Sequence, residues 1–154
     1  MDESAVAAQP APVSLSASEL AAALPAVRSA ARWFWWIAGL SLVNIFMLQT
    51  GSETSFVMGL GITAMSDAVF ASNKLIGFGI DASVLAFFAL LGLLAQRGQL
   101  WAFYMGTAVY ALDALIYVRF EDWMPAGFHA LAIFFIVKGV MVLREALKKT
   151  TGQR

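Results

Sequence analysis

The fold is decided by the stretch LIGFGIDASVLAFFALLGLLA-QRGQ-LWAFYMGTAVYALDALIYV, which runs from Leu75 to Val118. It contains two apolar segments, 75–95 and 100–118, each with about the 17 to 25 residues that a helix needs to cross a bilayer. The turn between them is short and polar, and its Gly98 suits the left-handed cap of a helix end. The sequence therefore predicts two membrane-spanning helices joined as an antiparallel hairpin.

The composition of the whole chain agrees with this prediction. Of its 154 residues, 60% are hydrophobic and 13% charged, and the mean hydropathy is +0.75. Soluble domains have roughly half apolar and about a quarter charged residues, so the main partner we expect is the lipid bilayer. Equal numbers of basic and acidic residues argue against nucleic-acid binding. The absence of cysteine and the single histidine exclude thiolate and two-histidine metal or haem sites, and we expect no cofactor.

Three further apolar segments decide the topology. Segments 33–49 and 126–143 are long enough to cross, whereas 56–71 is shorter and richer in Gly and Ser. If 56–71 does not cross, only Lys74 and Arg119 of the short-loop basic residues lie on one side of the membrane. The other side then holds Arg28, Arg32, Arg97, Arg144, Lys148, Lys149 and Arg154. This is the cleaner charge asymmetry, so it predicts both termini in the cytoplasm.

We therefore predict an all-α membrane protein, a four-helix transmembrane bundle with one short re-entrant or interfacial helix at 56–71. Residues 1–31 form a flexible N-terminal tail in this interpretation, because they lack the basic start of a signal peptide. Ser16 and Glu19 have capping-box spacing, which predicts a juxtamembrane helix that runs on past Pro25. The bundle then covers 32–147, and 148–154 form a basic C-terminal tail.

Polar residues inside the spans point to a candidate site. Asp81 lies seven residues after Lys74 and Asp113 six residues before Arg119, which places the two carboxylates about 10 and about 9 Å from the same membrane boundary. An ionisable group in hydrocarbon costs at least about 2.5 kcal/mol unless it faces the bundle interior and finds a partner. We expect Asp81 and Asp113 to lie near each other and to share a proton or a cation.

Other polar side chains fall at a similar depth and complete the predicted cluster. His129 can supply a positive charge or relay a proton. Two tyrosines, at −3 and +4 from Asp113, lie on its helical face and can donate hydroxyl hydrogen bonds. The short helix can cap the cluster with its own aspartate. The candidate ligand- or ion-binding residues are Asp81, Asp113, His129, Asn44, Tyr110, Tyr117 and Asp67.

Each candidate also has a purely structural interpretation. Asp81 and Asp113 can be a hydrogen-bonded pair that fixes helix register, and His129 an amphipathic residue near the boundary. Asn44 can join helices, and Asp67 can lie on the wet face of an interfacial helix.

The run WIAGLSLVN at 36–44, followed by the segment from Phe56 to Asp67 with its GLGIT core at 59–63, resembles small multi-pass bacterial membrane proteins of unassigned function. The resemblance implies a bacterial inner-membrane location and a distinct short helix. It implies no activity and no catalytic residues.

Three functions follow from these observations. The first is binding or translocation of a proton, cation or small polar ligand by the outer-leaflet cluster. The second is a non-catalytic accessory or assembly role in a homo-oligomer or a larger membrane complex. The third is a membrane enzyme that uses its carboxylates as general acid and base, which we favour least because no motif specifies catalysis.

Overall fold

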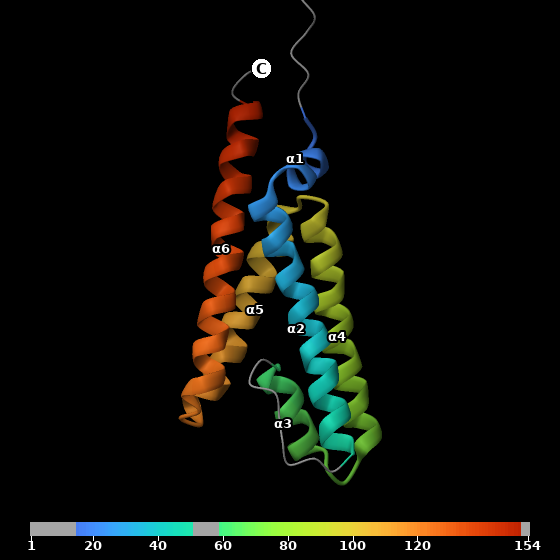
Figure 1. The fold of residues 1–154 in the computed structure, drawn as a ribbon. Helices are drawn as coiled ribbons and strands as arrows, with labels where there is room; N and C mark the ends of the chain where they lie inside the picture. Colours follow the sequence, from blue (N-terminus) through green and yellow to red (C-terminus); the bar gives the residue numbers. More distant parts are fainter. Residues whose placement is uncertain (1–14, 51–58, 152–154) are drawn as a thin grey trace, which may run out of the picture.

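The computed structural model describes residues 15–50 and 59–151, and these residues form helices and turns without a strand (Figure 1). The helices are α1 (Ala17–Ala23), α2 (Pro25–Gln49), α3 (Gly61–Val69), α4 (Lys74–Gln96), α5 (Leu100–Arg119) and α6 (Trp123–Thr151). Four of them, α2, α4, α5 and α6, are long and apolar enough to cross a membrane. The predicted all-α, four-helix bundle is confirmed, and the chain is an integral membrane protein.

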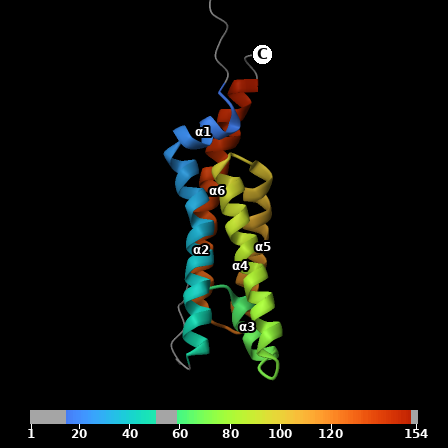
Figure 2. The ribbon, with the colours of Figure 1, turned by 90° about the vertical axis from the view of Figure 1, so that its right-hand side faces the viewer.

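The four long helices run alternately up and down, and the two short helices lie at opposite ends of the bundle (Figures 1 and 2). We call these the α1 end, where the last turn of α6 also lies, and the α3 end, where α2 ends and α4 begins. The nine residues of α3 span only about 13.5 Å, too little to cross a bilayer. The predicted short helix is therefore present without crossing. It begins later than expected, at Gly61, and residues 56–58 lie outside the described part of the chain.

The start of the bundle follows the predicted capping box but breaks at proline. Ser16 Oγ accepts the backbone N–H of Glu19, and the Glu19 carboxylate accepts the backbone N–H of Ser16 at 2.7 Å. The helix does not continue past Pro25, however, because Leu24 is extended and Pro25 opens a new helix. Proline disfavours helical backbone at the residue before it and suits the first helical position, so it separates α1 from α2.

Two of the long helices extend beyond the predicted spans. Helix α2 begins at Pro25 rather than at residue 33, and α6 covers Trp123–Thr151 rather than 126–143. Hydropathy marks only the part of a helix that lies in lipid, whereas a helix can continue into water with charged side chains. Lys148 and Lys149 lie in the last turn of α6, where positive charge stabilises a helix end.

Close contacts between small residues and rings hold the helices together. A Cβ on Gly139 of α6 would collide with the Cβ of Ala30 on α2, and a Cβ on Gly106 of α5 would collide with the Phe34 ring. Such close approach is what membrane helices need, since lipid gives them no hydrophobic drive to associate. At the α1 end, Gly98 has a φ of +74°, as its predicted role as a left-handed cap requires.

Candidate functional site

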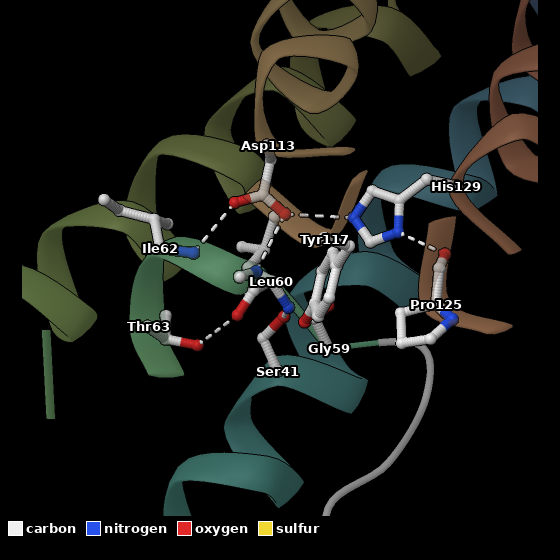
Figure 3. Close-up of polar contacts among 10 residues, drawn as sticks. Ser41, Gly59, Leu60, Ile62, Thr63, Asp113, Tyr117, Pro125 and His129 are labelled. Carbon is white, nitrogen blue, oxygen red and sulfur yellow. Dashed lines mark hydrogen bonds and ion pairs between the residues drawn. The ribbon is translucent and has the colours of Figure 1, made fainter. Parts of the chain in front are cut away.

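The N-terminus of α3 is held by a carboxylate from α5 (Figure 3). Asp113 Oδ2 accepts the backbone N–H of Gly61 at 2.8 Å, and its Oδ1 accepts the N–H of Ile62 at 2.9 Å. The first N–H groups of a helix have no partner within the helix and carry the positive end of its dipole. Asp113 thus satisfies two backbone donors and places negative charge where the helix favours it.

His129 of α6 lies on the other side of this carboxylate. Its Nε2 is 2.9 Å from Asp113 Oδ2, and its Nδ1 is 2.9 Å from the carbonyl oxygen of Pro125. A carbonyl oxygen only accepts, so Nδ1 carries a hydrogen, and one further proton lies between Nε2 and Oδ2. That proton joins Asp113 and His129 in a buried pair at ion-pair distance.

Two tyrosines surround the imidazole, but neither is shown to bond Asp113. The Tyr110 ring stacks on His129 with centroids 4.1 Å apart, and the Tyr117 ring is tilted against it at 5.1 Å. The Tyr117 hydroxyl donates to the carbonyl of Gly59 at 2.9 Å, and none of the hydrogen bonds in the described residues joins Tyr110 to Asp113. The expectation that both hydroxyls serve the carboxylate is therefore corrected. Their rings instead pack against the imidazole and hold it in place.

Side chains of α2 complete the contacts at the start of α3. The hydroxyl of Ser41 on α2 accepts the N–H of Leu60 at 3.0 Å, and within α3 itself Thr63 Oγ1 donates to the carbonyl of Leu60 at 2.8 Å. Asn44 is buried against Gly59, where a Cβ would collide with its side-chain amide. No water is available in the hydrocarbon region, so irregular backbone there needs such partners. The backbone at the start of α3 has them.

We call this group, Asp113, His129, Tyr117 and Ser41, the α3 anchor. The hydrogen bonds above use both oxygens of Asp113 and both nitrogens of His129. A group so fully bonded is suited to hold α3 in place rather than to receive a ligand.

A second polar group lies further along α3 and is not fully bonded. Asp81 Oδ1 accepts the Ser66 hydroxyl hydrogen at 2.8 Å, and Asp67 Oδ1 accepts an amide hydrogen of Gln49 at 3.2 Å. The Oδ2 atoms of both carboxylates are buried and have no hydrogen-bond partner among the described residues. Asp81 is only 1% exposed, and Asp67 Oδ1 would lie 3.7 Å from a Cβ on Gly77, one helical turn before Asp81. We call Asp67 and Asp81 the carboxylate pair.

The predicted partnership of Asp81 with Asp113 is replaced by this pair. Asp113 binds the start of α3 at Gly61, whereas Asp81 binds Ser66, five residues or about 7.5 Å further along the helix. The two aspartates therefore bond different parts of α3 and share no hydrogen-bond partner among the described residues. Asp67, which we expected to cap the cluster, lies beside Gly77 on the helix that carries Asp81.

An open cavity of about 350 Å³ reaches Asp67 at the α3 end. Gln49, Asp67 and Lys74 are its polar lining residues, and Phe70 with three alanines supplies the rest. Lys74 is exposed and makes no ion pair with the described residues. The cavity reaches the carboxylate pair at Asp67, and Asp81 does not line it.

Three contributing residues were missed by the sequence-based prediction: Ser41, Ser66 and Gln49. Ser41 has a weak signal, since it stands three residues before Asn44 and shares its helical face. Serine in a helix can equally bond a carbonyl of its own helix, so position alone does not reveal its partner.

Comparisons with known protein families, with curated proteins and with solved structures found no match to this chain.

Proposed function

We propose that the protein binds a proton or a monovalent cation between Asp67 and Asp81. The observation that carries the proposal is the presence of two buried carboxylate oxygens, one on α3 and one on α4, that lack a hydrogen-bond partner in the described structure. Burying a charged oxygen without a partner is costly, and two like charges close together add to that cost. A positive charge between the two carboxylates removes both penalties.

The surrounding atoms are oxygens, which suit a proton or a hard cation. The Ser66 hydroxyl lies 2.8 Å from Asp81 Oδ1 and 3.4 Å from the carbonyl of Gly77, and a Cβ on Gly77 would lie 3.7 Å from Asp67 Oδ1. Hydroxyl, carbonyl and carboxylate oxygens are the ligands that hard cations prefer. The described residues contain no group of three or more His, Cys, Asp or Glu that could hold a metal, so a single charge fits better than a multivalent ion.

Access to the pair favours binding over passage across the membrane. The cavity lined by Gln49 and Asp67 approaches from the α3 end. The core of the bundle otherwise contains fully buried rings, among them Phe34, Phe88 and Phe103. A bound cation therefore exchanges with one side only, and the proposal is one of binding.

The charge distribution supports an orientation with both termini in the cytoplasm. At the α3 end, the basic residues are Lys74 and Arg119. The α1 end carries Arg28, Arg32, Arg97, Arg144, Lys148 and Lys149. By the positive-inside rule the α1 end is cytoplasmic, and the carboxylate pair then lies toward the outer face. A bacterial inner membrane is part of this proposal and rests on the sequence-based expectation alone.

Thermal unfolding in detergent tests the proposal. Wild type, the double variant Asp67→Asn/Asp81→Asn and the exposed control Asp122→Asn are compared from about pH 5 to about pH 9, and with Na⁺, K⁺ or Ca²⁺ added. A cation at about 100 times its Kd stabilises the folded state by about 2.7 kcal/mol, or roughly 5 to 10 °C for a chain of this size.

We expect wild type and the Asp122 variant to respond to pH or to one monovalent cation, and the double variant to respond to neither. Identical responses of wild type and double variant would refute the proposal and favour the accessory-subunit function instead. A response to Ca²⁺ alone would overturn the assignment of a single charge.

A further inference from the structure

A cationic surface lies at the α1 end, far from the carboxylate pair. Arg28 and Arg32 are exposed, stand four residues apart on one face of α2, and line the same cavity. Within residues 15–50 and 59–151, no hydrogen bond or ion pair engages either guanidinium group. Their positive charge is therefore available to a partner from outside the chain.

Two hollows meet at Arg32. One, of about 250 Å³, lies where α1, α2 and α4 come together, and Arg28, Arg32 and Gln96 are its polar lining residues. The other, of about 420 Å³, follows α2 itself. Its lining residues are Ser29, Arg32, Trp33, Trp36 and Leu40. Arg32 lines both hollows, so the cationic lining of the first adjoins the mostly apolar lining of the second at this residue, and we call the two together the lipid-facing surface.

The dimensions and chemistry of this surface match a molecule with an anionic head and an apolar tail. From Arg32 to Leu40 the helix advances eight residues, or about 12 Å toward the middle of the membrane. Guanidinium groups bind phosphate through paired hydrogen bonds, and the Ser29 hydroxyl adds a donor beside Arg32. Trp33 and Trp36 carry indole rings, which favour the boundary between headgroups and acyl chains.

We propose that this surface binds an anionic phospholipid. Arg28, Arg32 and Ser29 hold its phosphate, and one acyl chain lies along Trp36 and Leu40. Charge complementarity identifies the occupant, because the α1 end carries six basic residues in the described helices and turns against the acidic Glu19 and Glu145. Anionic lipid collects at such a surface. The proposal stands independently of cation binding at the carboxylate pair.

Lipid-dependent stability tests the headgroup contact. Wild type, Arg28→Gln/Arg32→Gln and the control Arg119→Gln, which removes an exposed arginine at the α3 end, are purified in detergent and titrated with phosphatidylglycerol or phosphatidylcholine of identical acyl chains. Each arginine at an anionic surface contributes a similar favourable free energy, and two such contributions together correspond to a factor of about 30 in affinity. Wild type should therefore bind phosphatidylglycerol about 30-fold more tightly than phosphatidylcholine. The Arg119 variant should keep this preference and the double variant should lose it.

Three results would overturn the proposal: equal binding of the two lipids by wild type, an unchanged preference in the double variant, or the same stabilisation by inorganic phosphate alone. The last result would identify a phosphate-ion site without a lipid.

Quenching of tryptophan fluorescence tests the acyl-chain contact without depending on the fold of the arginine variants. Phosphatidylglycerol with brominated chains should quench wild type more than brominated phosphatidylcholine does. Replacement of both Trp33 and Trp36 by phenylalanine should remove the difference. Equal quenching of wild type by the two lipids would contradict the proposed path of the chain along α2.

Discussion

The substitution Asp113→Asn should loosen α3 from the bundle. Asp113 accepts the N–H groups of Gly61 and Ile62 and pairs with His129, so it joins α3, α5 and α6 at one point. Asparagine keeps the shape of the side chain but converts one acceptor oxygen into a donor group. That donor then faces either a backbone N–H or the imidazole, and the positive end of the α3 dipole loses its counter-charge.

The expected cost follows from these contacts. A hydrogen bond to a charged group contributes about 1.5 to 3 kcal/mol, and removal of one partner of a buried ion pair costs about 3 to 5 kcal/mol. His129 is 0% exposed, so water cannot replace the lost carboxylate without rearrangement. We expect a loss of about 3 to 5 kcal/mol in the free energy of unfolding, or roughly 6 to 20 °C in Tm for a chain of this size.

The assay combines unfolding in SDS, followed by circular dichroism, with hydrogen exchange of the α3 amides. The exposed control Asp122→Asn should stay within about 0.5 kcal/mol of wild type. The double variant Asp113→Asn/His129→Gln should cost less than the sum of its single variants, because the two side chains interact directly. A loss below about 1 kcal/mol in Asp113→Asn, with α3 amides protected as in wild type, would refute the role of Asp113 as an anchor.

Two further predictions concern packing and pH. Gly139→Ala should destabilise the bundle by about 1 to 3 kcal/mol in the same SDS assay, because the added Cβ would collide with Ala30. The matched control Gly127→Ala places its Cβ in open space and should show no loss of stability. Equal effects of the two substitutions would contradict the close approach of α2 and α6. Hydrogen bonds from the Ser16 hydroxyl and backbone N–H hold the pKa of Glu19 below its ordinary value. Ionised Glu19 therefore stabilises α1 fully at a pH above the ordinary pKa of glutamate. This stabilisation is lost as the pH falls through the lowered pKa of the folded protein. NMR chemical shifts of α1 should therefore report an acid step in wild type that Glu19→Gln lacks, and a step that persists in the variant would assign it to another group.

Much of the architecture was predictable because membrane burial imposes a strong pattern on sequence. The apolar segments 75–95 and 100–118 predicted α4 and α5 closely, since short polar turns bound both helices. The basic-residue count predicted that α3 does not cross, because one more crossing would divide the positive charge between both sides. The long ends of α2 and α6 were not predictable from hydropathy, which does not register helix that continues beyond lipid.

The burial of the ionisable residues in the spans was predictable, but their pairing was not. Asp81, Asp113 and His129 were identified because each is ionisable and lies in an apolar span. The number of residues along a helix predicts how far a side chain lies from the membrane boundary. It does not predict which neighbouring helix that side chain faces once α3 packs into the bundle. The pairing of Asp113 with His129, and of Asp81 with Ser66, depends on helix rotation and on the placement of α3. Neither is encoded in a local pattern of residues.

Infrared spectroscopy of aspartate-labelled protein tests most directly whether a positive charge lies between Asp67 and Asp81. Wild type at neutral pH is predicted to show either the C=O band of a protonated carboxyl group or carboxylate bands that shift when one monovalent cation is added. The same feature should be absent from Asp81→Asn and present in Asp122→Asn. Two ionised carboxylates whose bands respond to no cation would contradict the account, because the buried pair would then carry its charge without a partner.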